Sequence, residues 1–243
     1  MKDTIFELIE NKKIAFNTFE SRLRGDVSDI TAPGQFVNIK LDGFYLRRPI
    51  SVCDVEGDVL TIIYKVVGEG TRVMSELPIG ARLTVLTGLG NGYDLSLSGD
   101  RPLLVGGGAG VPPMYLLCRR LVAMGKTPTV ILGFGRAEEV FYEEKFASLG
   151  ARVIVCTADG SYGTQGFVTT PLSRIEYTYF YTCGPEPMLK ALYDATASSG
   201  QFSFEERMGC GFGACMGCSC KTKYGNKRIC RDGPVLTKEE IIW

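Results

Sequence analysis

Two hydrophobic patterns divide the chain. Up to about residue 98, apolar and polar positions alternate in short stretches, first at residues 4–10 and again at 36–40. Further strands are expected at 60–67 and 82–86. Turn signals such as the Ala-Pro-Gly at 32–34 separate these stretches. The pattern therefore predicts a small antiparallel β-barrel.

From residue 101 the pattern changes to strands that alternate with helices, which is typical of a parallel α/β sheet. Strands are expected at 102–105, 129–133, 152–157 and 177–182, and helices at 114–124 and 186–198. The glycine- and serine-rich stretches at 88–92 and 96–100 read as the connection to the barrel. We therefore expect three parts: a barrel at 1–98, a Rossmann-like α/β domain at 99–200 and a small segment at 201–243.

Composition narrows the possible functions. The chain has 27 basic and 27 acidic residues, so charge gives no reason to expect a nucleic acid or an anionic membrane as partner. No apolar run approaches the roughly 18 residues of a membrane span, and the start lacks a signal-peptide core. A cytoplasmic protein with reduced thiols is expected. Because the chain has no histidine, histidine-based catalysis and Rieske centres are excluded, and bound cofactors are expected to supply the difficult chemistry.

The last segment contains five of the nine cysteines. Four of them follow the spacing C-x4-C-x2-C-x11-C, which is typical of a plant-type [2Fe-2S] cluster; they are Cys210, Cys215, Cys218 and Cys230. Glycines between them allow a loop to wrap the cluster tightly. A structural zinc site is the main alternative, although only Cys215 and Cys218 have the usual zinc spacing. Cys220 is a spare thiol that could replace Cys218.

Two stretches of the barrel have the chemistry of an anion site. Residues 47–51 read Arg-Arg-Pro-Ile-Ser, in which a guanidinium can fork onto a pyrophosphate. Residues 63–71 read as a strand with a tyrosine and a lysine that runs into a glycine-rich turn, whose N–H groups can approach phosphates. The alternative for the first stretch is a basic loop that is exposed to solvent and binds no ligand.

The α/β region has a glycine-rich turn, residues 106–110, between its first strand and helix. Such a turn can cradle a pyrophosphate at a helix N-terminus, although the spacing is not a strict G-x-G-x-x-G. A Cys-Gly-Pro stretch, residues 183–185, follows the strand at 177–182; a small buried residue at a strand end is the alternative for Cys183. Near the second strand, Glu138 and Glu139 would repel a 2′-phosphate and Arg136 would attract one, which favours NAD over NADP.

Together these motifs resemble the ferredoxin-NADP reductase superfamily. The resemblance implies FAD, held by residues of the first two stretches: Arg48, Pro49, Ile50, Ser51, Ile63, Tyr64, Lys65, Gly70 and Thr71. It implies a nicotinamide nucleotide at the later turns: Gly106, Gly107, Gly108, Ala109, Gly110, Gly184 and Pro185. It also places Cys183, as the catalytic residue, beside the nicotinamide and flavin rings.

The cysteine-rich end is more specific. The run Arg-Met-Gly-Cys-Gly-Phe-Gly-Ala-Cys-Met-Gly-Cys, followed by Ile-Cys-Arg-Asp-Gly-Pro-Val-Leu, resembles electron-transfer subunits of NAD-dependent, type B dihydroorotate dehydrogenases. That resemblance implies a separate FMN-containing catalytic subunit, an assembly of two copies of each, and a path from FMN through the cluster and FAD to NAD. An apolar patch near the cluster is expected, with Phe212, Met216 and Trp243 as candidates.

Three alternatives stay open at this point. A reductase subunit of the same superfamily would serve a ferredoxin, a hydrogenase or a bifurcating partner. A non-enzymatic iron–sulfur or zinc regulator would bind no flavin. An α/β domain that binds neither metal nor flavin is the third alternative.

Residues 222–229 are expected to form a hairpin around a Gly225-Asn226 turn that returns Cys230 to the other cysteines.

Overall fold

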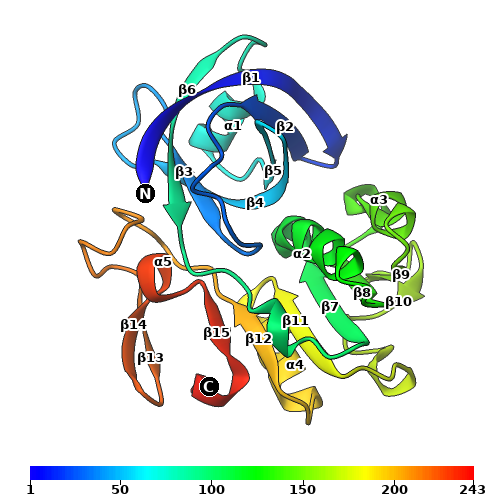
Figure 1. The fold of residues 1–243 in the computed structure, drawn as a ribbon. Helices are drawn as coiled ribbons and strands as arrows, with labels where there is room; N and C mark the ends of the chain where they lie inside the picture. The colour runs from blue at the N-terminus through cyan, green and yellow to red at the C-terminus, as the bar shows by residue number, and fades with distance from the viewer.

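The computed structural model describes residues 1–243, and its N-terminal part is a closed six-stranded antiparallel barrel (Figure 1). The strands are β1 (Lys2–Ala15), β2 (Thr18–Arg24), β3 (Phe36–Ile39), β4 (Arg48–Glu56), β5 (Val59–Lys65) and β6 (Arg82–Leu89). They join in the order β1-β2-β5-β4-β3-β6, with β6 closing onto β1. Alternate side chains fill the interior, among them Phe6, Leu8 and Leu60, which are almost fully buried. The barrel predicted from the alternating pattern is confirmed.

The second part is a parallel sheet covered by helices. Its strands are β7 (Pro102–Gly107), β8 (Thr129–Phe134), β9 (Arg152–Thr157), β10 (Thr164–Gln165), β11 (Tyr179–Cys183), β12 (Gly200–Ser203) and β15 (Val235–Thr237). Their order is β10-β9-β8-β7-β11-β12-β15, and only β15 runs antiparallel to its neighbour. The helices are α2 (Val111–Ala123), α3 (Glu143–Ser148) and α4 (Glu186–Ala195). The predicted α/β fold is confirmed.

The last part is a cysteine-rich loop and a two-stranded hairpin. The hairpin consists of β13 (Ser219–Thr222) and β14 (Gly225–Arg228), and the short helix α5 (Ile229–Asp232) follows it. The predicted turn at Gly225-Asn226 is wrong, because Thr222 pairs with Gly225 and the turn is Lys223-Tyr224. The Thr222 hydroxyl donates to the Gly225 carbonyl and accepts from the Tyr224 N–H, which stabilises this register.

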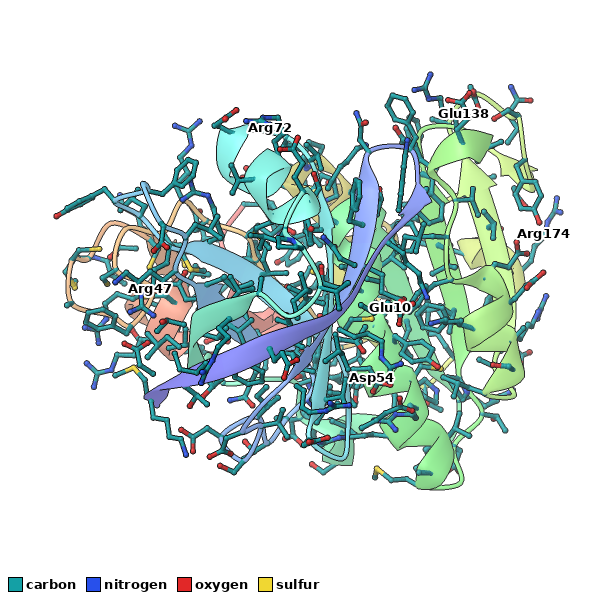
Figure 2. All side chains as sticks on the ribbon, turned by 90° about the horizontal axis from the view of Figure 1, so that it is seen from above. Glu10, Arg47, Asp54, Arg72, Glu138 and Arg174 are labelled. Carbon is teal, nitrogen blue, oxygen red and sulfur yellow. The ribbon has the colours of Figure 1, made fainter.

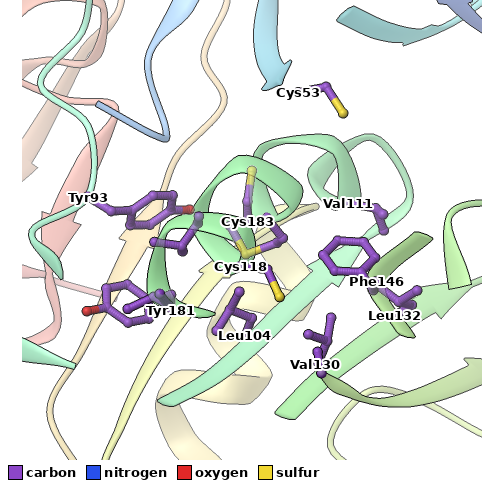
Figure 3. Close-up of a cluster of buried hydrophobic side chains, with 14 of the residues drawn as sticks. Cys53, Tyr93, Leu104, Val111, Cys118, Val130, Leu132, Phe146, Tyr181 and Cys183 are labelled. Carbon is purple, nitrogen blue, oxygen red and sulfur yellow. The ribbon is translucent and has the colours of Figure 1, made fainter. Parts of the chain in front are cut away.

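Helix α2 joins the barrel to the sheet. Eight of its residues are buried, and their spacing covers two faces of the helix. Leu116 packs into the barrel core, whereas Met114, Leu117 and Leu121 pack into the core of the α/β domain. Figure 3 shows Cys118 of this helix beside Leu104 of β7 and Cys183 of β11. The barrel and the sheet therefore share continuous packing rather than a loose linker.

The cysteine-rich end packs onto the same sheet. Cys218, Ile229 and Cys230 belong to one buried cluster with Phe36 of the barrel and Phe202 of β12. Since β12 and β15 are strands of the sheet, the chain after residue 200 contributes to the α/β core as well as to the cysteine loop. The division into parts at 1–98, 99–200 and 201–243 stays a prediction.

Candidate functional site

A cleft of about 400 Å³ lies where the three parts of the chain meet. Its volume is in the range of ligand sites. The barrel supplies residues predicted for FAD, and the α/β domain supplies Ala109 and Cys183. Ten predicted site residues line it: Arg48, Pro49, Ile50, Ser51, Ile63, Tyr64, Lys65, Thr71, Ala109 and Cys183. The start of the cysteine-rich segment supplies a third wall, with Glu205 and Met208.

Arg48, the first residue of β4, presents a cation to this cleft that no carboxylate neutralises. Its guanidinium lies 4.7 Å from the centre of the Phe44 ring and donates a hydrogen bond to the Leu46 carbonyl. A Cβ atom at position 70 would lie 2.1 Å from Nε of Arg48, so the guanidinium occupies the space that a side chain there would take. Arg48 forms no ion pair. An unpaired cation in a cleft of this volume fits a pyrophosphate.

The predicted glycine-rich turn after β5 is the start of a helix, α1 (Glu69–Ser75). The Thr71 side chain accepts hydrogen bonds from the N–H groups of Val67 and Gly68 and donates to the Gly68 carbonyl. Those two N–H groups are thus bonded within the turn. Gly70 does not line the cleft; its contribution is the space for Arg48.

A second cleft, of about 640 Å³, opens at the carboxyl edge of the parallel strands. This edge is where parallel α/β sheets bind ligands. Of the residues predicted for the nicotinamide nucleotide, four line it: Gly107, Gly108, Ala109 and Pro185. Lys65 and Ala109 line both clefts, so the two spaces adjoin.

The remaining predicted glycines bring the two nucleotide turns together. A Cβ atom at position 110 would lie 2.1 Å from the carbonyl oxygen of Cys183, and one at position 106 would lie 2.9 Å from Cα of Val111. Gly184 adopts a φ of +156° and borders a neighbouring hollow instead of the second cleft. Neither Gly106 nor Gly110 lines the second cleft. Gly106 leaves room for the start of α2 against the end of β7, and Gly110 permits the backbones of the two turns to touch.

Cys183 ends β11 at the base of the first cleft and is 1% exposed. Burial and the nearby Glu205 carboxylate raise the pKa of this thiol, so it stays protonated at neutral pH. Glu205 itself has a raised pKa, because the surrounding cleft walls partly desolvate its carboxylate. Sequence reasoning assigned no role to Glu205; it lies 22 residues from Cys183 in the chain and meets it only through the pairing of β11 with β12.

The order of charged groups at the second cleft bears on the choice of nucleotide. Glu139 lines the cleft, and its carboxylate accepts from the Gly135 N–H and from Lys65. Arg136 points away, onto the Phe16 ring of the barrel, and lies 3.4 Å from Glu138. Of the three residues predicted to bear on the choice of nucleotide, Glu139 lines the cleft and Arg136 does not, although Lys65, which pairs with Glu139, lines the cleft too.

The four predicted ligand cysteines stand as two pairs. Cys210 accepts hydrogen bonds through its sulfur from the N–H groups of Ala214 and Cys215, and Cys218 accepts one from the N–H of Cys230. The thiols of Cys210 and Cys215 contact each other, as do those of Cys218 and Cys230. No three of the metal-binding side chains gather around one point. Two pairs of thiols fit a cluster in which each iron takes two cysteines.

The protonation of these thiols reflects their surroundings. Partial burial acts to raise the pKa of Cys210, but backbone N–H groups of Cys215 and Phe212 outweigh it and lower that pKa to about 6. Burial and the neighbouring Cys218 raise the pKa of Cys230 to about 12. Cys220 lies in β13 opposite Lys227 and makes no hydrogen bond to the other thiols, so it stands apart from the pairs.

The barrel holds the cysteine loop through Asn38 of β3, which sequence reasoning did not identify. Its side-chain nitrogen donates to the Cys210 carbonyl at 3.3 Å. A Cβ atom at position 211 would lie 2.4 Å from the same nitrogen, so the loop lies directly on β3. No sequence signal links positions 38 and 210, since their proximity follows only from the closed barrel.

Comparison with known proteins agrees with this geometry. Residues 205–242 match the family described as the iron-sulfur cluster binding domain of dihydroorotate dehydrogenase B. None of the helices is long and apolar enough to cross a membrane. A solved structure of an NADH-dependent reduced ferredoxin-NADP oxidoreductase, studied for flavin-based electron bifurcation, has a TM-score of 0.88 and 28% identity, and it covers 98% of this chain and 90% of that one.

Curated relatives are similar over their whole length. The electron transfer subunit of dihydroorotate dehydrogenase B (NAD(+)) from Fusobacterium nucleatum is 44% identical and aligns with 96% of this chain and 95% of its own length. The subunit of the same name from Bacillus pumilus is also 44% identical, over 99% and 98%. The chain therefore belongs to the family of electron transfer subunits of dihydroorotate dehydrogenase B (NAD(+)).

Proposed function

We propose that this chain binds FAD, a [2Fe-2S] cluster and NAD(H), and that it passes electrons from the FMN-containing catalytic subunit of dihydroorotate dehydrogenase B to NAD+ in pyrimidine biosynthesis. The observation that carries the proposal is the cleft with three walls. The barrel, the turn with Cys183 and the start of the cysteine segment all reach this one space. A group bound there adjoins both the nucleotide cleft and the cysteine loop.

The barrel residues hold FAD. Arg48 meets the pyrophosphate with its free guanidinium, and Gly70 leaves room for it. Residues 49–51 and 63–65 form the wall beside the ring, and the Thr71 hydroxyl fixes the start of α1 next to them. A bound flavin supplies the exchange between two-electron hydride transfer and one-electron transfer.

The α/β residues hold and orient NAD(H). The turn at residues 107–109 provides close backbone approach for the pyrophosphate, and Pro185 borders the opposite side of the cleft. Cys183 is a neutral thiol in the wall of the first cleft, so it adds no charge beside a hydride transfer. The Tyr93 hydroxyl donates to the Thr182 carbonyl at 2.9 Å and fixes the end of β11 that carries Cys183.

Cys210, Cys215, Cys218 and Cys230 hold the cluster as two pairs. N–H groups directed at the sulfurs of Cys210 and Cys218 stabilise thiolate charge, and such bonds tune the reduction potential of a cluster. Asn38 fixes the loop to the barrel. The loop thereby keeps a constant position relative to the flavin cleft.

Oxidation of dihydroorotate belongs to the partner subunit. The chain has no histidine, and both clefts are assigned above to FAD and the nicotinamide nucleotide. We propose an assembly of two copies of each subunit in the cytoplasm. The nine free cysteines support a reducing compartment.

The test is reconstitution with the purified catalytic subunit under anaerobic conditions. The complex is expected to reduce NAD+ with dihydroorotate, whereas the isolated chain, loaded with FAD and iron, is not. Turnover of dihydroorotate by the isolated chain would contradict the proposal. The likeness to the bifurcating oxidoreductase favours one alternative, service to a ferredoxin-type partner; in that case reconstitution with the catalytic subunit would give no NADH.

A further inference from the structure

The loop that follows β8, residues 135–142, borders the second cleft and is tied to the barrel. Lys65 of β5 pairs with Glu139 of the loop at 3.1 Å. The N–H of Phe16, in the turn between β1 and β2, donates to the Glu138 carbonyl at 2.8 Å. Figure 2 shows Glu138 at the edge of the molecule, beside this hairpin of the barrel. The barrel therefore helps to set the course of a loop that borders the nucleotide cleft.

The turn between β1 and β2 is itself fixed on both sides. Asn17 adopts a φ of +50°, and its carbonyl accepts a hydrogen bond from the Val66 N–H at 2.7 Å. The Thr18 hydroxyl donates to the Phe16 carbonyl at 3.0 Å. The backbone of Phe16 is thus held by the barrel, while its side chain remains 39% exposed.

The ring of Phe16 holds the arginine of the loop. The guanidinium carbon of Arg136 lies 4.4 Å from the centre of this ring, which is a cation–π contact. The Glu138 carboxylate lies 3.4 Å from the same guanidinium. Arg136 directly follows Gly135, which lines the second cleft, yet Arg136 itself does not line it. The ring and the carboxylate therefore keep a cation outside a cleft whose edge it adjoins in the chain.

The position of this cation bears on which nucleotide fits the cleft. In parallel α/β sheets an acidic residue after the second strand accepts a hydrogen bond from the 2′-hydroxyl of a ribose, whereas a nearby arginine accommodates a 2′-phosphate. Glu139 follows β8 and lines the cleft, and its carboxylate is paired with Lys65. If the guanidinium of Arg136 turned toward the cleft, its fork of N–H donors would attract a phosphate at this point.

We propose that Phe16 is a specificity-determining residue for NAD(H). Its ring, together with Glu138, holds Arg136 away from the cleft, so a nucleotide with a 2′-phosphate meets the Glu139 carboxylate without the help of that guanidinium. Phe16 acts through Arg136 and lines neither cleft, so it is a positioning residue. The inference rests on the proposed function, because it concerns the nucleotide that exchanges hydride with the flavin. The barrel thereby takes part in a choice that is made in the α/β domain.

The experiment measures reduction of the flavin by NADPH and by NADH in stopped flow, on the full chain loaded with FAD and iron. The quantity compared is the ratio of the two second-order rate constants. Phe16→Ala should raise the ratio of NADPH to NADH about threefold, the size expected when an exposed cation–π contact is lost. Phe16→Leu, which keeps an apolar side chain in the turn, should give the same gain. Phe16→Tyr is the matched control and should keep the wild-type ratio, since it retains an aromatic face.

A second background shows whether the gain comes from the arginine. In Arg136→Gln protein, Phe16→Ala should leave the ratio unchanged, because there is no guanidinium to release. In the chain that has Arg136, the gain should shrink as the ionic strength rises, since salt screens the attraction between charges. A gain that persists without Arg136, or a wild-type ratio in Phe16→Ala and Phe16→Leu proteins with intact visible spectra, would overturn the inference and leave the proposed function intact. If NADH does not reduce the flavin of the intact wild-type chain, both proposals are wrong.

Discussion

Substitution of Gly110 by alanine should separate electron entry from cofactor binding. Position 110 touches the backbone of the turn that follows β11: a Cβ atom there would lie 2.1 Å from the Cys183 oxygen, 2.3 Å from its carbonyl carbon and 2.5 Å from the Gly184 nitrogen. These are backbone atoms, which no side-chain rotation can move aside. To reach an ordinary contact the two turns must separate by about 1 Å, at a cost of about 1–3 kcal/mol for overpacking.

A shift of that size at the base of the flavin cleft moves Cys183 and the nicotinamide site away from the flavin. Misplacement of reacting groups by about 1 Å can lower a rate roughly 100-fold. We therefore expect Gly110→Ala to reduce its flavin with NADH about 100-fold more slowly in stopped-flow measurements, while it keeps FAD, iron and full reduction by dithionite. Arg48 and the cysteine pairs do not contact position 110, so their cofactors should be unaffected.

The control is Gly68→Ala, since a Cβ atom at position 68 meets nothing within 4 Å and Gly68 has an extended backbone. That variant should be reduced by NADH at the wild-type rate. If folded Gly110→Ala protein is also reduced at the wild-type rate, the close approach of the two turns does not position the hydride transfer, and the reasoning is refuted.

Four other variants test the remaining parts of the structure. Arg48→Gln should weaken FAD binding about 10- to 100-fold, the effect of losing a charged hydrogen bond of about 1.5–3 kcal/mol, as measured by flavin fluorescence; unchanged affinity would remove Arg48 from the pyrophosphate site. Cys218→Ser should lose its iron, and Cys220→Ser should keep it, by iron and sulfide analysis; the reverse would make Cys220 the ligand. Tyr142→Phe removes a hydrogen bond to Glu20, a carboxylate of β2 that is almost fully buried. This variant should lower the midpoint of thermal unfolding by several degrees at neutral pH. Burial acts to raise the pKa of Glu20, but this hydrogen bond and the nearby lysines lower it, so the stabilisation is present above the unfolded pKa and is lost as the pH falls through the lower pKa of the folded state. A difference from wild type that does not shrink in acid would contradict the assignment.

The sequence predicted the parts of the fold that follow from local pattern. Alternation predicted the barrel, and the strand-helix order predicted the parallel sheet. Strand β2 was not predicted, because charged residues interrupt its apolar pattern. Some of them face solvent, and Glu20 is buried and ion-paired in the interface between the barrel and the α/β domain. The return of β15 to the sheet was also missed, because a three-residue strand that pairs with a segment more than 30 residues away leaves no local signal.

The candidate site likewise has residues whose role the sequence predicted and residues whose role depends on the three-dimensional fold. The roles of Arg48 and of the spaced cysteines could be predicted from the sequence, because each role follows from the chemistry of the residue itself. Gly106 and Gly110 were predicted to hold a nucleotide; neither lines the second cleft, and Gly110 touches the backbone of the turn that follows β11. That distinction depends on which strands are neighbours: β7 and β11 are adjacent in the sheet although about 70 residues separate them, so their turns meet.

The hairpin turn shows how local propensity can be overruled. Gly-Asn is a good turn sequence, yet Lys223-Tyr224 forms the turn. The observed register lets Thr222 bond to Gly225 and pair with Ile241 near the end of the chain. A shift by two residues would lose both contacts.

The most direct test of the account is the composition and magnetic signature of the purified chain, prepared without oxygen. We expect two irons, two acid-labile sulfides and one FAD per chain, with an electron paramagnetic resonance signal of a reduced [2Fe-2S] cluster after dithionite treatment. One zinc ion per chain in place of iron, or a chain that binds iron but no FAD, would contradict the claim that one cleft joins a flavin to both a nucleotide and a cluster.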